Sequence, residues 1–139
     1  LVIPHLPRAG AFLTPSLIAT QHLQSHFVQD EIFGPVITLE TFSDDEDALT
    51  RANATRYGLA SSIWTSDVAR AIRVSHRLDV GVTWINDHLP IASEAPHGGV
   101  KGSGFGKDMS HEAVLEYTVT RHIMVKHAQP VVHDSFRPA

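Results

Sequence analysis

Apolar and polar positions alternate along the chain in blocks that predict strands and helices in turn. Apolar, β-rich runs occupy residues 36–42, 59–64 and 80–85. The stretches between them begin at Ser43 and Ser66 and carry apolar residues at helical spacing. An order of strand, helix, strand, helix, strand with short connections predicts right-handed βαβ units in a parallel sheet, which is the α/β class.

Further elements are predicted on both sides of this unit. Residues 10–20, which contain Pro15, predict an extended segment at a sheet edge, and residues 21–30 predict a short helix. Past the third strand, Ser110 begins another short helix and residues 118–125 predict a last strand. A three-stranded parallel sheet has two open flanks, so we expect the sheet to continue in chain that is not part of this sequence.

The first helix carries a capping box. The Ser43 hydroxyl can accept a hydrogen bond from the backbone of Glu46, and the Glu46 carboxylate can reach back to Ser43. The acidic residues at 44–47 lie at the positive end of the helix, where they are favoured. The pattern therefore places the start of this helix at Ser43.

A long glycine-rich loop follows the third strand and is irregular over residues 86–107. Its second half, residues 96–107, holds five of the nine glycines, together with Val100 and Phe105. A flexible spacer lacks such apolar anchors, and a loop of this length is usually either functional or disordered. The spacing fits neither the Walker phosphate loop nor GxGxxG, so the loop is a surface for some other ligand or partner.

Composition narrows the function classes. The net charge is −4 and no stripe of Lys and Arg exists to neutralise a phosphate backbone, so we do not expect a nucleic-acid partner. No apolar run approaches the length of a membrane span and no signal-peptide pattern opens the chain, which predicts a cytoplasmic protein that does not enter a membrane. The sequence opens on Leu1 without a cap or turn, as a piece of a longer protein would.

The ten histidines do not predict a metal site. His22 and His26 have no third ligand placed by the sequence, and the HExxH pattern that begins at His111 fails at Leu115. Because the chain has no cysteine, it has no disulfide, thiolate metal site or cysteine nucleophile. We expect scattered surface histidines and no metal.

One acidic residue is a candidate for binding. Glu31 stands beside Phe33 before a Gly-Pro turn, where a carboxylate could accept hydrogen bonds from a sugar diol. On the residues alone, the simpler interpretation is a surface carboxylate next to a buried phenyl ring.

Five motifs in order resemble the C-terminal part of the catalytic domain of the NAD(P)-dependent aldehyde dehydrogenase superfamily. They are EIFGPV at 31–36, NATRYGL at 53–59, WIN at 84–86, PHGGVKGSGFG at 96–106 and YT at 117–118. The similarity extends from about residue 10 to residue 126. Each motif alone is weak, but their shared order makes chance agreement implausible.

The resemblance implies a division of the chain and an assembly. Residues 1–117 would form a partial catalytic domain with a parallel βαβ sheet, residues 118–126 an oligomerisation strand, and residues 127–139 a C-terminal tail. In the family this strand pairs with a neighbouring subunit, which implies a homo-oligomer, either a dimer or a tetramer.

The resemblance also implies a reaction and roles for two residues. The family oxidises an aldehyde through attack by a cysteine thiolate, hydride transfer to the nicotinamide and hydrolysis by a glutamate-activated water. These groups and the dinucleotide-binding domain lie upstream of EIFGPV in the family, so the chain by itself should be inactive. The glutamate of this motif binds the nicotinamide ribose and its phenylalanine packs near the nicotinamide, which implies these roles for Glu31 and Phe33. The expected cofactor is NAD, with NADP as the alternative.

The loop after Asn86 lines the substrate tunnel in the family, and Ile91 and His97 occupy such positions here. Many members have phenylalanine or tryptophan where this chain has His97. That histidine, with GKDMS at 106–110 and RHIMVKH at 121–127, is most similar to bacterial aminobutyraldehyde dehydrogenases. The implied substrate is an ω-aminoaldehyde such as 4-aminobutanal from polyamine breakdown, with Asp87 and Glu94 as acids near the mouth.

Two other hypotheses remain beside a fragment of an aldehyde dehydrogenase. The chain could be a non-catalytic assembly module that pairs with full-length subunits through residues 118–126. It could also be an unrelated α/β domain with a structural role, in which case the order of the motifs would be coincidence.

Overall fold

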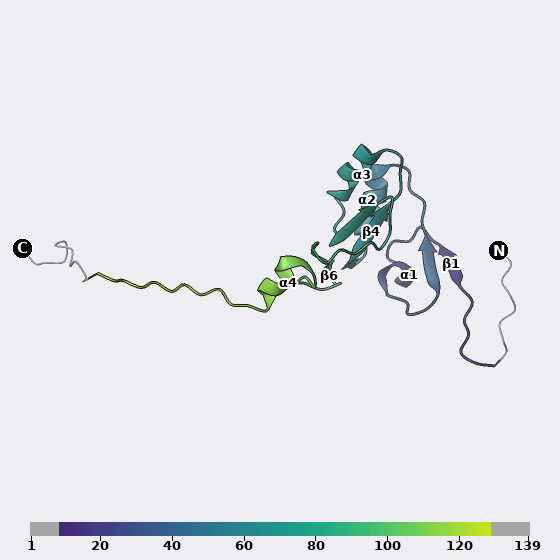
Figure 1. Cartoon of the computed structure of the whole chain (residues 1–139). Helices are drawn as coiled ribbons and strands as arrows, with labels where there is room; N and C mark the ends of the chain where they lie inside the picture. The colour runs from purple at the N-terminus through teal and green to yellow at the C-terminus, as the bar shows by residue number, and fades with distance from the viewer. Residues whose placement is uncertain (1–8, 129–139) are drawn as a thin grey trace, which may run out of the picture.

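The computed structural model describes residues 9–128 and has an α/β architecture with parallel strands (Figure 1). The predicted fold class is therefore confirmed at this level. The elements in order are β1 (Ser16–Ala19), α1 (His26–Gln29), β2 (Val36–Leu39), α2 (Asp45–Asn53), β3 (Tyr57–Gly58), β4 (Ala60–Ile63), α3 (Val68–Ser75), β5 (Val82–Ile85), β6 (Val100–Lys101) and α4 (Ser110–Glu116).

The N-terminal unit is a parallel pair of strands joined through a single helical turn. β1 runs beside β2 in the register Ser16↔Val36 to Ala19↔Leu39, and α1 lies in the connection. The Ser25 hydroxyl caps α1 by accepting from the Phe27 backbone N–H over 3.2 Å. The predicted edge strand and short helix are both present, although each is shorter than predicted.

The central unit is a βαβ unit in which β4 and β5 are parallel and α3 connects them. The register runs from Ala60↔Val82 to Ile63↔Ile85. α2 lies beside α3 (Figure 1). Among the described residues, the buried hydrophobic side chains are Leu49 of α2 and Ala71 of α3. The small core therefore lies in this helical layer.

The three predicted strands do not share one sheet, which corrects the sequence interpretation. Within the described residues, β2 pairs with β1, β4 pairs with β5, and β3 pairs with β6, so three two-stranded sheets form. The alternation of strands and helices predicted β2, α2, β4, α3 and β5, but not the two-residue strands β3 and β6. It could not predict which strands are neighbours, because strand order depends on contacts between distant parts of the chain.

The helix starts also differ from the prediction by about one residue. The caps of α2 and α3 are Asp44 and Asp67 rather than Ser43 and Ser66, and each aspartate accepts from a backbone N–H over 2.9 Å. The reciprocal bond at α2 comes from Asp47, which accepts the Ser43 backbone N–H over 3.0 Å. That hydrogen bond is the main reason why the pKa of Asp47 lies below its usual value.

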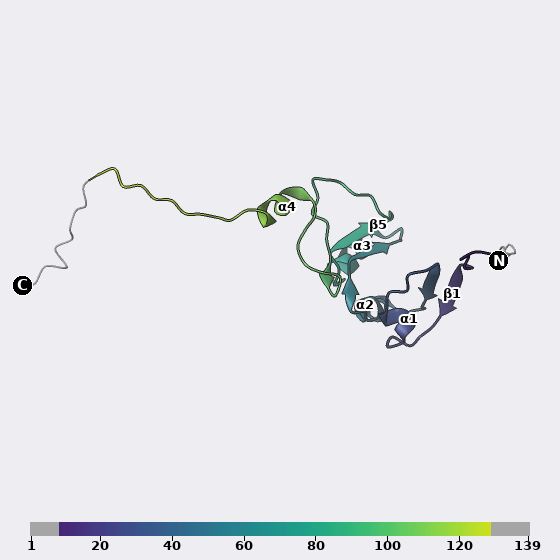
Figure 2. The ribbon, with the colours of Figure 1, turned by 90° about the horizontal axis from the view of Figure 1, so that it is seen from below.

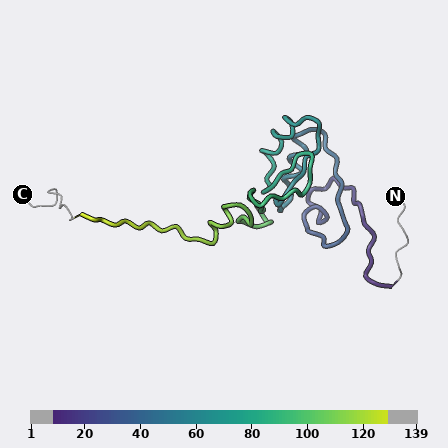
Figure 3. The backbone as a smooth tube through the Cα atoms, in the orientation of Figure 1, coloured from purple at the N-terminus to yellow at the C-terminus, as the bar shows by residue number. Residues whose placement is uncertain are grey.

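The start of α4 differs in the opposite direction. Its N-cap is Met109 rather than Ser110, and the Met109 side chain makes no capping hydrogen bond. The Ser110 hydroxyl instead accepts from the Glu112 backbone N–H over 3.2 Å. After α4 the chain runs away from the body of the molecule (Figure 3), and residues 121–127 adopt neither helix nor strand. The strand predicted at 118–126 therefore has no ladder partner within the described chain. Most of the predicted tail at 127–139 lies outside the described residues. No helix among residues 9–128 has the length and apolarity needed to cross a membrane.

Asn53, the last residue of α2, ties this helix to the chain that enters β5. Its Nδ2 donates to the carbonyl oxygen of Arg77 over 2.9 Å, and its Oδ1 accepts from the Asp79 backbone N–H over 2.8 Å. We expect Asn53→Ala to lower the free energy of unfolding by about 1–3 kcal/mol, because two hydrogen bonds are lost. Urea denaturation of the full-length protein measures this change. Thr50→Ala, an exposed change on the same helix, is the control and should have little effect.

Candidate functional site

The glycine-rich loop after β5 is anchored in its middle. It arches away from β5 (Figure 2) and returns as β6, which pairs antiparallel with β3 in the register Tyr57↔Lys101 and Gly58↔Val100. The sequence predicted a loop that is irregular throughout, and β6 corrects this prediction. β6 divides the loop into a first half between β5 and β6 and a second half between β6 and α4.

The loop packs so closely that two glycines are needed. A Cβ atom on Gly81, at the start of β5, would lie 1.7 Å from the carbonyl oxygen of Gly98. Gly98 itself has φ +151°, and a Cβ there would lie 2.4 Å from the carbonyl oxygen of Gly106. The density of glycines thus reflects close approach of backbone segments to one another.

A clasp, defined here as residues 97–98 and 107–108, joins the two halves of the loop. The imidazole Nδ1 of His97 lies 2.9 Å from Oδ1 of Asp108, and the Asp108 backbone N–H donates to the His97 carbonyl oxygen over 3.0 Å. Lys107 donates from its ammonium to the Gly98 carbonyl oxygen over 3.1 Å. Its backbone N–H donates to the Glu116 carboxylate over 3.0 Å, which connects the clasp to α4.

The first half of the loop is held near β4 and β5 by side chains. Asn86 accepts from the Thr65 backbone N–H over 2.8 Å, and the indole N–H of Trp84 donates to the Pro90 carbonyl oxygen over 2.9 Å. His88 Nδ1 lies 2.8 Å from the Ser62 hydroxyl oxygen. Ile91, the predicted pocket residue, follows this anchored stretch and is half exposed.

All four non-glycine residues with positive φ in the described chain lie in or at the end of this loop. They are Asn86, Leu89, Lys101 and Ser110, with φ between 54° and 66°. Left-handed backbone is strained for residues other than glycine and concentrates at functional sites. The conformation of the loop is therefore consistent with a functional role.

Glu31 and Phe33 lie apart from this loop, in the turn that precedes β2. Both are exposed, and the Phe33 side chain is 92% exposed, so the prediction of a buried phenyl ring is wrong. Among the described residues, Glu31 makes no hydrogen bond or ion pair, and none connects Glu31 or Phe33 to Ile91 or His97. The chain thus presents two separate candidate surfaces, a carboxylate with an aromatic ring and a glycine-rich loop.

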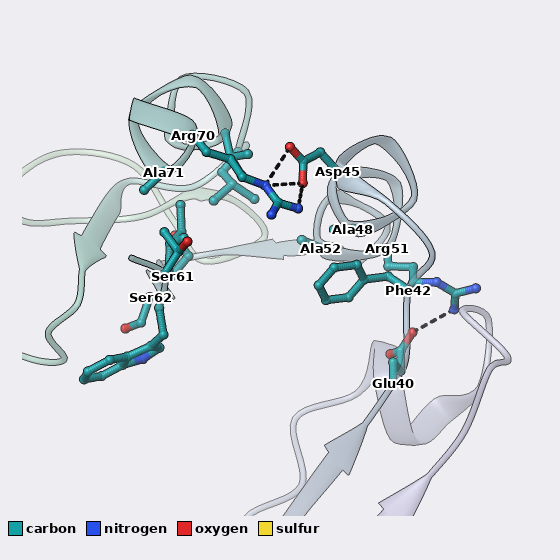
Figure 4. Close-up of a pocket in the computed structure, with 15 residues that line it drawn as sticks. Glu40, Phe42, Asp45, Ala48, Arg51, Ala52, Ser61, Ser62, Arg70 and Ala71 are labelled. Carbon is teal, nitrogen blue, oxygen red and sulfur yellow. Dashed lines mark hydrogen bonds and ion pairs between the residues drawn. The ribbon is translucent and has the colours of Figure 1, made fainter. Parts of the chain in front are cut away.

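A groove of about 520 Å³ lies elsewhere, between α2, α3 and β4, and contains none of the four predicted site residues. Figure 4 shows Phe42, Ala48, Ala52 and Ala71 along it. At its rim, Arg70 of α3 donates from Nε to the Asp45 carboxylate of α2 over 2.9 Å. This hydrogen bond is the main reason why the pKa of Asp45 lies below its usual value. The groove is an apolar packing surface, and the chemistry expected for the site lies outside it.

Among residues 9–128, no group of three His, Asp or Glu side chains is arranged to hold a metal ion. Sequence reasoning used the GKDMS motif at 106–110 only for the resemblance and assigned no role to Lys107 or Asp108, which belong to the clasp. A signal was available, because a charged pair at 107–108 directly follows the last glycine of the loop.

Comparisons with known proteins identify relatives for most of the chain. The profile of the aldehyde dehydrogenase family matches residues 3–123. Betaine aldehyde dehydrogenase of Bacillus subtilis is 42% identical over 114 residues, which cover 82% of this chain and 23% of that protein. Succinate-semialdehyde dehydrogenase [NADP(+)] of Deinococcus radiodurans is 40% identical over 109 residues, which cover 78% of this chain and 23% of that protein.

A solved structure gives the same result in three dimensions. The crystal structure of betaine aldehyde dehydrogenase from Staphylococcus aureus in complex with NAD+ superposes with a TM-score of 0.85 at 35% identity. The match covers 97% of this chain and 28% of that one. The chain therefore spans about a quarter of the length of the relatives it matches.

Proposed function

The chain belongs to the aldehyde dehydrogenase family, and from this premise we propose that it is the part of an NAD-dependent enzyme that holds the cofactor ribose and the substrate loop. The full-length enzyme would oxidise an aldehyde to the carboxylic acid. The observation that carries the proposal is the match over residues 3–123. The chain has no cysteine, so the nucleophile would come from the remainder of the protein.

Glu31 and Phe33 would bind the cofactor. The Glu31 carboxylate is exposed and makes no hydrogen bond or ion pair among the described residues, so it is free to accept from the two hydroxyls of a ribose. Phe33 is almost fully exposed and offers a ring face for packing against the nicotinamide. The bound cofactor would supply the acceptor for the hydride. The S. aureus relative was crystallised with NAD+, whereas the D. radiodurans relative is named for NADP(+), and we propose NAD.

A substitution at Glu31 tests this role. We expect Glu31→Gln in the full-length enzyme to raise the KM for NAD about tenfold, because charge-assisted hydrogen bonds to the ribose become neutral ones. Steady-state kinetics with varied NAD measure the change. Asp30→Asn is the matched control, because this neighbouring carboxylate faces Arg56 at 3.3 Å and has no role in the proposal. Equal KM values for Glu31→Gln and wild type would contradict the assignment.

The loop supports a cationic substrate such as an ω-aminoaldehyde. Its first half, residues 86–99, contains no lysine or arginine. Lys101 and Lys107 lie beyond it and donate to the carbonyl oxygens of Asn53 and Gly98, both over 3.1 Å. Asp87 and Glu94 are exposed and form no ion pair among residues 9–128. The first half of the loop therefore presents uncompensated negative charge, which attracts an ammonium group. Ile91 and His97 would line the pocket.

The substrate assignment is tested by comparing aldehydes. We propose 4-aminobutanal, formed in the cytoplasm during polyamine breakdown, and expect its kcat/KM to exceed that of butanal, which has no charge at its far end. Higher specificity constants for simple alkanals would contradict this substrate while leaving aldehyde oxidation itself intact.

An assembly role for the C-terminal segment is the second candidate. Val119, Ile123, Met124 and Val125 are all exposed. Apolar side chains on an extended segment without a ladder partner favour strand addition to another subunit. We therefore propose residues 118–126 as an oligomerisation strand that follows a partial catalytic domain at 1–117. Sedimentation of an Ile123→Asp variant tests this, because a charge at a paired strand should shift the homo-oligomer toward smaller species.

A further inference from the structure

His97 has one ring nitrogen occupied and one available. Its Nδ1 lies 2.9 Å from the carboxylate of Asp108. A carboxylate only accepts hydrogen bonds, so Nδ1 carries the hydrogen and Asp108 accepts it. In the neutral ring, Nε2 then holds a lone pair, and no hydrogen bond engages it among the described residues. The pair therefore converts the imidazole into an acceptor with a defined orientation.

The contact between His97 and Asp108 is better explained by orientation of the imidazole ring than by a contribution to the stability of the fold. The His97 side chain is 25% exposed and that of Asp108 is 67% exposed. Solvent screens a pair with one partner so exposed, and such pairs contribute little to folding. The carboxylate of Asp108 holds the ring at Nδ1, and the Asp108 backbone N–H donates to the His97 carbonyl oxygen, which keeps the two residues side by side. A carboxylate that accepts from one ring nitrogen fixes the tautomer and the orientation of the ring, as it does for many histidines that bind metals through the other nitrogen.

The charge of the loop alone would not distinguish one cation from another. Asp87 and Glu94 attract a primary ammonium and a trimethylammonium group to similar extents, because Coulomb attraction depends on charge and distance. A primary ammonium carries three N–H donors, whereas a trimethylammonium group carries none. An acceptor such as Nε2 of His97 can therefore discriminate between them.

Resting on the proposed oxidation of an ω-aminoaldehyde, we propose that Asp108 is a positioning residue for His97 and that Nε2 accepts a hydrogen bond from the primary ammonium group of the substrate. The chain then selects primary amines over quaternary ones. This preference is opposite to the one that the names of its betaine aldehyde dehydrogenase relatives suggest.

The test uses the full-length enzyme and two aldehydes, 4-aminobutanal and its N-trimethylated analogue. The readout is the ratio of their kcat/KM values. We expect His97→Asn to lower this ratio about tenfold, mainly through the KM for 4-aminobutanal, because a hydrogen bond to a charged group is lost. His97→Asn keeps an N–H in place of Nδ1 for Asp108, so thermal unfolding should be close to wild type.

Asp108 is tested by a double-mutant cycle. Asp108→Ala should lower the same ratio by a similar factor, and Asp108→Glu should restore it. If Asp108 acts through His97, then Asp108→Ala has no further effect on the ratio in the His97→Asn background. Should His97→Asn fail to fold, His97→Gln replaces it, and the ratio in that variant should again be insensitive to Asp108→Ala.

The outcomes separate this inference from the proposed function. Turnover of 4-aminobutanal with additive effects of the two substitutions would overturn the positioning role and leave the proposed function standing. Equal losses of kcat/KM for both aldehydes would also overturn the positioning role, because they would indicate a contact that only supports the structure of the loop. If 4-aminobutanal is not oxidised at all, the proposed substrate is wrong, and this inference is wrong with it.

Discussion

Expressed by itself, the 139-residue chain should aggregate or unfold without a cooperative thermal transition, and it should not oxidise aldehydes. Among the described residues only Leu49 and Ala71 are buried hydrophobic residues. Large apolar side chains remain exposed across the molecule, including Phe12, Phe42, Trp64, Phe105 and Tyr117. Exposed apolar surface on this scale favours association, and a core this small cannot balance the conformational entropy lost on folding.

Calorimetry and size-exclusion chromatography measure this outcome directly. The full-length enzyme is the control and should give a sharp transition under the same conditions. A soluble monomer of the isolated chain with one sharp, cooperative transition would contradict the prediction. Activity of the isolated chain would contradict the role of a missing cysteine nucleophile, because this chain contains no thiol.

The second large effect is expected at Gly81. In Gly81→Ala the new Cβ atom would lie 1.7 Å from the Gly98 carbonyl oxygen, and this neighbour is backbone, so it cannot rotate away. The loop must move by more than 1 Å relative to β5. We expect a loss of stability of about 1–3 kcal/mol or more. We also expect about a 100-fold loss of kcat/KM, because His97 adjoins Gly98 and misplacement by 1 Å has that order of effect.

Gly104→Ala separates a steric clash from backbone strain. Gly104 has φ +117°, but a Cβ there would meet nothing within 4 Å. This change should cost about 1–3 kcal/mol through backbone strain, with a smaller loss of kcat/KM than Gly81→Ala. Denaturation curves and steady-state kinetics of the two variants provide the comparison. Similar catalytic losses in both would contradict the importance of the close approach between β5 and the loop.

The sequence predicted the elements better than their partners. The runs at 36–42, 59–64 and 80–85 became β2, β4 and β5, because apolar runs of β-branched residues between turn signals are local features. The pairing of β2 with β1 was not predicted, because strand order is decided by packing between segments far apart in the sequence. The caps moved from Ser43 and Ser66 to the next acidic residue. Ser and Asp cap helices about equally well, so the sequence alone could not choose between the two neighbouring positions.

The candidate site was only partly accessible from the sequence. The roles of Glu31, Phe33, Ile91 and His97 came from the resemblance to a family, and they stay predictions. The exposure of Phe33 contradicts the simpler interpretation from the residues alone, but it leaves the ring available for the role near the nicotinamide that the resemblance implies. The role of Asp108 entered only with the structure, since its contact with His97 joins residues that are 11 positions apart, on either side of β6.

The pairing of β6 with β3 has an evolutionary consequence. The two residue pairs between β6 and β3 divide one long loop into two shorter loops. Each shorter loop closes at a lower entropic cost than the long one. Residues 87–95 can then change, or even vary in number, while the clasp between residues 97–98 and 107–108 keeps its geometry. If the loop lines the substrate site, as proposed, changes at residues 87–95 would alter which aldehyde enters without disturbing the clasp.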